Sequence, residues 1–257
     1  MVRNFSSPRS ILITGASNGI GAALATGYAA PGVFLALAGR NADRLEAVAR
    51  QCRQRGADVA VKTIEVVDRA AMAAWIEGVD DAHPLDLVIA NAGISAGTAR
   101  STDPVEKVRE IFAVNVDGLL NTLDPAIARM RPRRRGQLAV VSSIAGFRGL
   151  PGTTAYAASK AAVRSYGEGL RGSLWEDGIG VSVICPGFVV SGMTAVNPFR
   201  MPFIMGADKA AGIIRRGLAR DKARIAFPWP MYVVVWLMSV LPPAWTDPLF
   251  RRLPRNP

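Results

Sequence analysis

A tyrosine and a lysine four residues apart are the side chains in this sequence whose types and spacing could best move a proton. Tyr156 and Lys160 would share one face of a helix, because residues at i and i+4 are neighbours there. A free tyrosine has a pKa of about 10 and is a poor base at neutral pH. A nearby ammonium stabilises the phenolate, and lowering that pKa by ~3 units needs ~4 kcal/mol, of which Lys160 could supply part. Such a pair is also common on purely structural helices, so its surroundings decide its meaning.

A glycine-rich turn near the start of the chain could hold a phosphate group. The stretch from Thr14 to Gly21 follows a short apolar run and opens a stretch of helical periodicity. Its glycines would let the backbone turn tightly and let a pyrophosphate approach the N-terminus of the helix. This context early in a βαβ unit predicts dinucleotide binding. The expected contacts come from Gly15, Ser17, Asn18, Gly19, Ile20 and Gly21.

The residues at the end of the second apolar run bear on the choice between NAD and NADP. An NAD site of this type usually has an acidic residue there, which bonds the ribose 2′-hydroxyl. Gly39 takes that place, and Arg40 follows it. An arginine can pair with a 2′-phosphate, whereas a carboxylate would repel it. We therefore expect NADP(H) to be preferred over NAD(H), the alternative being that Arg40 is only a solvated residue at a helix start.

Small and polar residues end the fourth and fifth apolar runs. The first of these groups is Asn91, Ala92 and Gly93, and the second includes Ser143. Open α/β sheets place their ligand crevice at such strand ends, and small side chains leave room for a cofactor. Asn115 lies within an apolar helical stretch, where its amide must find hydrogen bonds. It is therefore either a satisfied core residue or part of a site.

Short apolar runs alternate with longer stretches of helical periodicity. Runs that lack polar alternation suit strands buried on both faces of a parallel sheet. Strand–helix alternation then predicts an α/β, single-domain Rossmann fold, a doubly wound parallel sheet with helices on both faces. The predicted strands span residues 10–14, 33–38, 59–64, 85–90, 137–142 and 180–185.

Taken together, these motifs resemble the short-chain dehydrogenases/reductases, in the branch of ~250 residues with a TGxxxGxG loop and a YxxxK pair. The match covers residues 10 to about 192 in the right order and spacing. The resemblance implies that Tyr156 is the general acid/base and that Lys160 lowers its pKa and holds the nicotinamide ribose. Ser143 would hydrogen-bond the substrate oxygen, and Asn115 would support a water-linked proton relay to Lys160.

The resemblance also implies cofactor contacts outside the glycine turn. The backbone of Val189 and the side chain of Ser191 would hold the carboxamide. Two positions depart from the family pattern while keeping the functional group: Glu65 replaces an aspartate beside the adenine, and Ser191 replaces a threonine. The full expected set adds Arg40, Glu65, Val66, Asn91, Ala92, Gly93, Tyr156, Lys160, Pro186, Gly187, Val189 and Ser191 to the glycine turn, and no metal.

The chain divides into three parts within one domain. Residues 1–192 are expected to form the dinucleotide-binding and catalytic core, 193–223 a substrate lid, and 224–257 the last strand with an apolar and basic C-terminal extension. Apolar side chains of the lid could line a pocket or pack on the core. They are Met193, Phe199, Met201, Phe203, Ile204 and Met205.

The apolar run 231–241 in the C-terminal extension is too short to span a bilayer. As a helix it would be hydrophobic all round and must be covered by something. The tryptophans and tyrosine in and before it, with Arg251, Arg252 and Arg255 after it, suit an interfacial anchor on an anionic membrane. The run could equally guard the entrance to a lipid-sized pocket or form a subunit interface, and we expect a homo-oligomer.

Composition excludes several other classes of protein. Half of the 257 residues are hydrophobic, which rules out a disordered chain. Two cysteines and one histidine cannot build a disulfide framework or a multi-histidine metal centre. The net charge of +11 is concentrated in residues 200–257, which carry +7, but no nucleic-acid-binding motif accompanies it. The polar residues 1–9 do not read as a signal peptide, so we expect a cytoplasmic protein, associated with membrane only through the C-terminal segment.

We therefore expect an NADP(H)-dependent oxidoreductase that interconverts an alcohol with a ketone or aldehyde on a small, apolar substrate. One alternative is a catalytically silent nucleotide-binding regulator on the same fold, which would have no need of Ser143, Tyr156 and Lys160 together. The other is an enzyme related to sugar-nucleotide epimerases or dehydratases. The glycine spacing and the lack of a large C-terminal substrate domain count against it.

Overall fold

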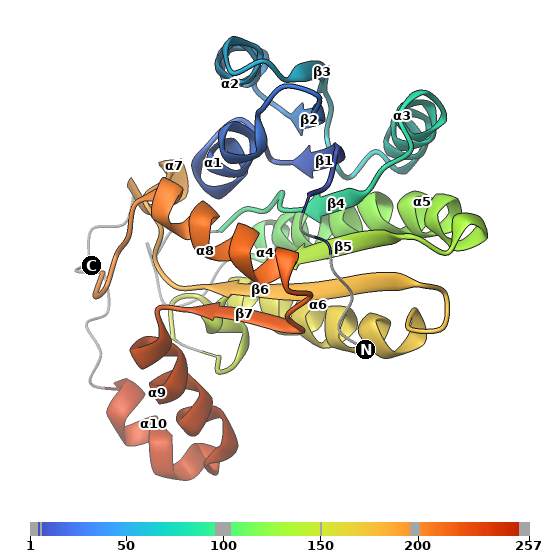
Figure 1. The fold of residues 1–257 in the computed structure, drawn as a ribbon. Coiled ribbons are helices and arrows are strands. Elements are labelled where there is room, and N and C mark those ends of the chain that lie inside the picture. Colours follow the sequence, from blue (N-terminus) through green and yellow to red (C-terminus); the bar gives the residue numbers. More distant parts are fainter. Residues whose placement is uncertain (1–4, 6, 96–103, 150, 196–200, 252–257) are drawn as a thin grey trace.

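The apolar runs form one parallel sheet of seven strands, in the order β3-β2-β1-β4-β5-β6-β7 (Figure 1). The structure is a computed structural model that describes residues 5, 7–95, 104–149, 151–195 and 201–251. The strands are β1 (Ser10–Thr14), β2 (Phe34–Gly39), β3 (Asp58–Thr63), β4 (Leu87–Ala90), β5 (Gly136–Val141), β6 (Ile179–Pro186) and β7 (Arg224–Phe227).

Helices cover both faces of the sheet, as alternating side chains of the strands require. Ile11 and Ile13 of β1 belong to one hydrophobic cluster, and Leu12 belongs to the other. On the first face lie α1 (Gly19–Tyr28), α2 (Ala42–Gln54) and α8 (Ala207–Ala219). On the second lie α3 (Arg69–Ala82), α5 (Gly118–Arg133) and α6 (Thr154–Ser173), and α4 (Val105–Phe112) packs against α6. The predicted α/β architecture is confirmed.

The strand order reverses between β1 and β4, which lie side by side although β2 and β3 follow β1 in the chain. In open α/β sheets a ligand crevice forms at such a switch point, outside the carboxyl ends of the strands. The glycine turn follows β1, and the turn at 91–93 follows β4. A 3₁₀ turn, η2 (Ile144–Gly146), follows β5. The fold therefore brings these segments to one edge of the sheet.

The C-terminal residues form a helical pair beyond the sheet, drawn in red in Figure 1. The pair consists of α9 (Trp229–Val240) and α10 (Pro243–Arg251), and it follows β7 directly. No residue of α9 is fully buried. In the part of the chain that the structure describes, no helix has the length and apolar character needed to cross a membrane. The expectations for Phe199, Arg252 and Arg255 fall outside the described residues.

Candidate active site

A cavity of about 1120 Å³ opens at the carboxyl edge of the sheet and gathers nearly all of the predicted site residues. Gly21 and Asn115 are the two that do not line it; they lie directly behind the wall. The predicted residues that line it are Gly15, Ser17, Asn18, Gly19, Ile20, Arg40, Glu65, Val66, Asn91, Ala92, Gly93, Ser143, Tyr156, Lys160, Pro186, Gly187, Val189 and Ser191.

The glycine turn forms a cradle that larger residues could not occupy. Gly15 and Gly19 have φ angles of +65° and +54°, in the left-handed region that favours glycine. A Cβ on Gly15 would lie 2.9 Å from the Cα of Ala92. Asn18 caps α1 by accepting a hydrogen bond from the Gly19 amide at 2.7 Å. The open backbone at the start of α1 fits the pyrophosphate of a dinucleotide.

Asn91 fastens the end of β4 to the glycine turn. Its side-chain Nδ2 donates to the carbonyl oxygens of Thr14 and Gly15, at 3.0 and 3.1 Å. The backbone amides of Asn91 and Ala92 both donate to the Thr14 hydroxyl, at 3.1 and 3.2 Å. Gly21 leaves room for this arrangement, since a Cβ there would lie 2.6 Å from Asn91 Nδ2. Asn91 therefore acts on the cradle by holding its shape.

Asn115 lies in a π-helical turn, η1 (Ala113–Asp117), rather than in the regular helix that its apolar neighbours suggested. Such turns are rare and occur often at functional sites. Its Oδ1 accepts from the Ile94 amide at 2.8 Å, and its Nδ2 donates to the Ile94 carbonyl and to Ser159 Oγ. The side chain is 1% exposed. Asn115 therefore joins the segment after β4 to helix α6.

Tyr156 and Ser143 meet at the floor of the cavity. Tyr156 comes from the first turns of α6, and Ser143 from the end of β5. Burial raises the pKa of Tyr156, and a hydrogen bond with Ser143 acts in the opposite direction. Ser143 Oγ also accepts from the Ala145 amide at 3.1 Å and donates to the Pro186 carbonyl at 3.3 Å. The hydroxyl of Ser143 is thus oriented by three neighbours.

Lys160 lies one turn along α6 from Tyr156, with its ammonium 5.8 Å from the centre of the tyrosine ring. Its Nζ donates to the Val141 carbonyl at 3.0 Å, and its own carbonyl accepts from Ser142 Oγ at 2.7 Å. Burial lowers the pKa of Lys160 to about 8, so the amine is mostly charged at neutral pH. A Cβ on Gly93 would lie 3.2 Å from this Nζ, so a larger residue there would press on the amine of Lys160.

Two arginines stand at the far end of the cavity, beside the end of β2. Arg40 was predicted there, but Arg44 was not. Asn41 caps α2 by accepting from the Arg44 amide at 2.9 Å, and this first helical turn brings Arg44 beside Arg40 at the cavity. The signal that could have found Arg44 is Asn41, a helix-capping residue type that places residue 44 in the first turn of a helix.

The lid residues divide between the two roles that their composition allowed. Met193 lines the cavity, whereas Met205 packs against the core and forms a bridge with Val189. Phe203 and Ile204 do neither and are exposed. Met231 and Val235 reach the cavity from α9; the sequence indicated that the run 231–241 could guard a pocket, but not which of its residues would face it.

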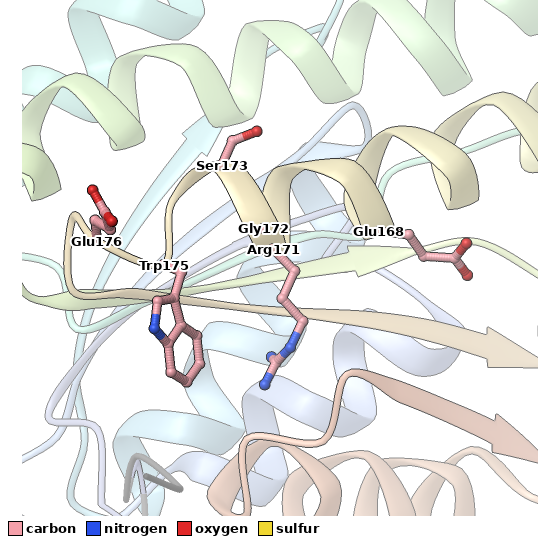
Figure 2. A pocket seen from close by; sticks show the side chains of 6 residues that line it. All are labelled: Glu168, Arg171, Gly172, Ser173, Trp175 and Glu176. Atoms are coloured by element: carbon pink, nitrogen blue, oxygen red, sulfur yellow. The ribbon is translucent and has the colours of Figure 1, made fainter.

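A second hollow lies at the C-terminal end of α6, away from these residues (Figure 2). It is lined by Glu168, Arg171, Gly172, Ser173, Trp175 and Glu176. Arg171 forms an ion pair with Asp221, and Glu168 forms ion pairs with Arg164 and Arg224. Two charged groups of this hollow, Arg171 and Glu168, therefore hold α6 to its neighbours through Asp221 and Arg224.

Comparison with known proteins agrees with the geometry. Residues 9–199 match the short chain dehydrogenase family. An uncharacterized oxidoreductase of Myxococcus xanthus (strain DK1622) is 41% identical over 246 residues, covering 95% of this chain and 97% of that protein. An 11-beta-hydroxysteroid dehydrogenase-like protein, 4A, of Arabidopsis thaliana is 33% identical, covering 90% of this chain and 80% of its own.

Solved structures of the same kind share the fold. A short chain dehydrogenase/reductase from Burkholderia phymatum, in complex with NAD, has a TM-score of 0.84 at 24% identity and covers 99% of both chains. One from Sphingobium yanoikuyae, in complex with NADPH, has a TM-score of 0.78 at 25% identity and covers 91% of this chain and 97% of its own. The chain belongs to the short-chain dehydrogenase family and is an NAD(P)-dependent oxidoreductase.

Proposed function

We propose that the protein interconverts a ketone and a secondary alcohol, with Tyr156 as the general acid/base and NADP(H) as the preferred cofactor. The observation that carries this proposal is the meeting of Ser143, Tyr156 and Lys160 at one end of a cavity whose other end is a dinucleotide cradle. A regulator that only bound nucleotide would have no use for the three together, which disfavours that alternative.

The proton chemistry follows from the surroundings of Tyr156. Because burial raises its pKa, the phenol keeps its proton at neutral pH and can donate it to a substrate oxygen that becomes an alkoxide. Ser143, in contact with the same phenol, hydrogen-bonds that oxygen and fixes its position. The charged Lys160 stabilises the phenolate that remains after the transfer. We propose that Asn115 supports the return of a proton towards Lys160, through the segment at Ile94 that it holds.

Residues along the cavity would hold the cofactor, whose nicotinamide supplies the hydride when it is bound. The pyrophosphate would lie on the amides of the glycine turn, and the adenine beside Glu65 and Val66. Arg40, joined by Arg44, would pair with a 2′-phosphate. The turns at 91–93 and 186–187, with Val189 and Ser191, would enclose the nicotinamide and its ribose, the latter held by Lys160.

The substrate is proposed to be neutral and mostly apolar. Among the described residues that line the cavity, the charged ones are Arg40, Arg44, Glu65 and Lys160. The first three lie at the proposed adenosine end. Lys160 donates to the Val141 carbonyl and lies beside the Tyr156 ring. The remaining lining at the catalytic end includes Ile94, Ile144, Phe188, Met193 and Pro202. Such a lining suits a substrate without a charged group.

For the outer face of α9 we propose one of two partners, an anionic membrane surface or a second subunit. Its exposed side chains include Trp229, Val233, Trp236 and Leu237. Contiguous apolar surface of this kind usually marks an interaction site. The basic residues that follow would add attraction to anionic lipid. Binding to vesicles, against the oligomeric state in solution, separates the two.

Replacing Tyr156 by phenylalanine tests the catalytic assignment. We expect Tyr156→Phe to bind NADPH normally and to lose at least 90% of turnover with ketones, because positioned acid–base catalysis contributes about 10²–10⁴-fold. Tyr166→Phe is the matched control, since Tyr166 lies on the same helix with an exposed side chain. More than about a tenth of wild-type activity in Tyr156→Phe would remove Tyr156 from the mechanism.

A further inference from the structure

Helix α9 comes after residues 9–199, which carry the match to the short chain dehydrogenase family, yet two of its residues line the cavity. The match ends at residue 199, whereas Met231 and Val235 line the cavity from α9. We infer that these two side chains set the size of the apolar group that the substrate carries on its carbonyl carbon. The inference rests on the proposed function and adds to it a substrate class, neutral ketones with an extended apolar arm.

The start of α9 lies close to the catalytic residues. Gly187 separates the two, because a Cβ there would lie 2.9 Å from Pro228 Cδ and 3.4 Å from Met231 Sδ. The residue before it, Pro186, accepts the hydrogen bond from Ser143 Oγ. An arm extending from a carbonyl held at Ser143 would therefore meet Met231 first and Val235 one turn later.

A cluster around Tyr232, the neighbour of Met231, fixes α9 in place. Tyr232 packs edge-on against Phe147, with ring centres 5.4 Å apart, and its hydroxyl accepts from Arg224 at 3.0 Å. The guanidinium groups of Arg164 and Arg224 lie 4.5 and 5.2 Å from the centre of the Phe147 ring. Phe147 follows the 3₁₀ turn that Ser143 caps. The cluster thus ties α9 to the segment that carries a catalytic side chain.

The next helix adds a second attachment to the same segment. Arg148 donates to Asp247 at 2.7 Å and to Thr246 Oγ1 at 3.3 Å, and both acceptors belong to α10. Since neighbouring residues 147 and 148 each hold one helix of the pair, α9 is held as a fixed wall. A fixed wall discriminates between substrates by length and bulk, whereas a mobile one would adapt to them.

Two adjacent valines on α9 provide a matched comparison. Val235 lines the cavity and is partly buried, whereas Val234 is 50% exposed and does not line it. Both have the same helical surroundings, so one substitution at each position differs only in the face that it alters. Along an apolar wall each methylene removed from water strengthens binding about fourfold.

The test uses 2-butanone and 2-decanone with the NADPH-loaded enzyme. We expect the kcat/KM of wild type to be higher for 2-decanone than for 2-butanone. Val235→Phe should lower the ratio of the two kcat/KM values at least tenfold, while the kcat/KM for 2-butanone changes less than threefold. Val234→Phe should leave both ketones unchanged. Met231→Ala, which adds no bulk, should lower the kcat/KM for 2-decanone severalfold. This variant replaces Val235→Phe in the test if Val235→Phe does not fold.

A binding measurement separates failure of this inference from failure of the proposed function. In the Tyr156→Phe background, calorimetry of 2-decanone with the NADPH complex reports on the wall without turnover. Weaker binding with Val235→Phe than with Val234→Phe would support the inference even if no ketone were reduced by the parent enzyme. Equal affinities in the two variants, or no binding of 2-decanone at all, would overturn it.

Discussion

Replacing Lys160 by methionine should stabilise the protein while abolishing its activity, because the site holds a charge that the fold must bury. Lys160 is 4% exposed, and burial lowers its pKa from 10.5 to about 8. The native state therefore holds this proton less tightly than the unfolded state does. Methionine has a similar length and no charge, so Lys160→Met removes the penalty together with the proposed stabilisation of the Tyr156 phenolate.

The penalty can be worked out from the two pKa values. Their difference corresponds to about 3 kcal/mol at pH 7, since one pKa unit is worth about 1.4 kcal/mol. Loss of the hydrogen bond from Nζ to the Val141 carbonyl destabilises the variant by about 1 kcal/mol, so its net stabilisation over wild type is about 2 kcal/mol. Because the folded pKa is the lower one, wild type gains stability as pH rises from about 8 towards 10.5. The advantage of the variant should shrink by about 2–3 kcal/mol between pH 7 and pH 10.

Urea unfolding of both proteins without cofactor, at pH 7 and at pH 10, measures this directly. Lys209→Met is the matched control, because Lys209 is exposed on α8 and should show no such pH dependence. NADPH oxidation with a ketone gives the activity of each protein. If the difference between wild type and Lys160→Met were the same at both pH values, the buried charge would not be the cause.

Three further perturbations test other parts of the site. Arg40→Ala should narrow the preference for NADPH over NADH by about tenfold in kcat/KM, and Arg44→Ala by a similar factor; equal use of both cofactors by wild type would refute the assignment. Gly93→Ala should lower kcat at least tenfold, because its Cβ would crowd the side chains of Asn115 and Lys160; unchanged kcat would show that these side chains can shift without loss of activity. Wild type should sediment with anionic vesicles and the double variant Trp229→Gln/Trp236→Gln should not; wild type left in the supernatant would leave a subunit interface as the role of this face.

Most of the fold could be predicted because a parallel sheet leaves a clear trace in the sequence. Every residue of β5 and β6 is buried, so these strands had to be apolar along their whole length. The polar exceptions are Gln137, whose amide donates to the Leu218 carbonyl at 2.9 Å, and Ser182, which is fully buried in β6. The edge strand β3 was predicted from the same kind of short apolar run, at 59–64, although most of its residues are exposed.

The site was predictable where it depends on strand ends and the glycine turn, and less so where helices bring in residues. Arg44 reaches the cavity because Asn41 caps α2 and the helix begins at Ala42, and the end of β2 alone does not show this. The π-helical turn around Asn115 has no pattern of its own among apolar neighbours. Its hydrogen bonds to Ile94 and Ser159 join segments that lie far apart in the chain.

The orientation of α9 was beyond the reach of the sequence for a physical reason. A helix that is apolar on every side contains no periodicity that could say which side meets the protein. The choice is made by polar contacts at its edges, above all the hydrogen bond between Tyr232 and Arg224 and the packing of Tyr232 on Phe147. Those contacts turn Met231 and Val235 to the cavity and leave Trp236 outside. The apolar character of α9 thus serves two surfaces at once, and only the inner one is accounted for by the proposed chemistry.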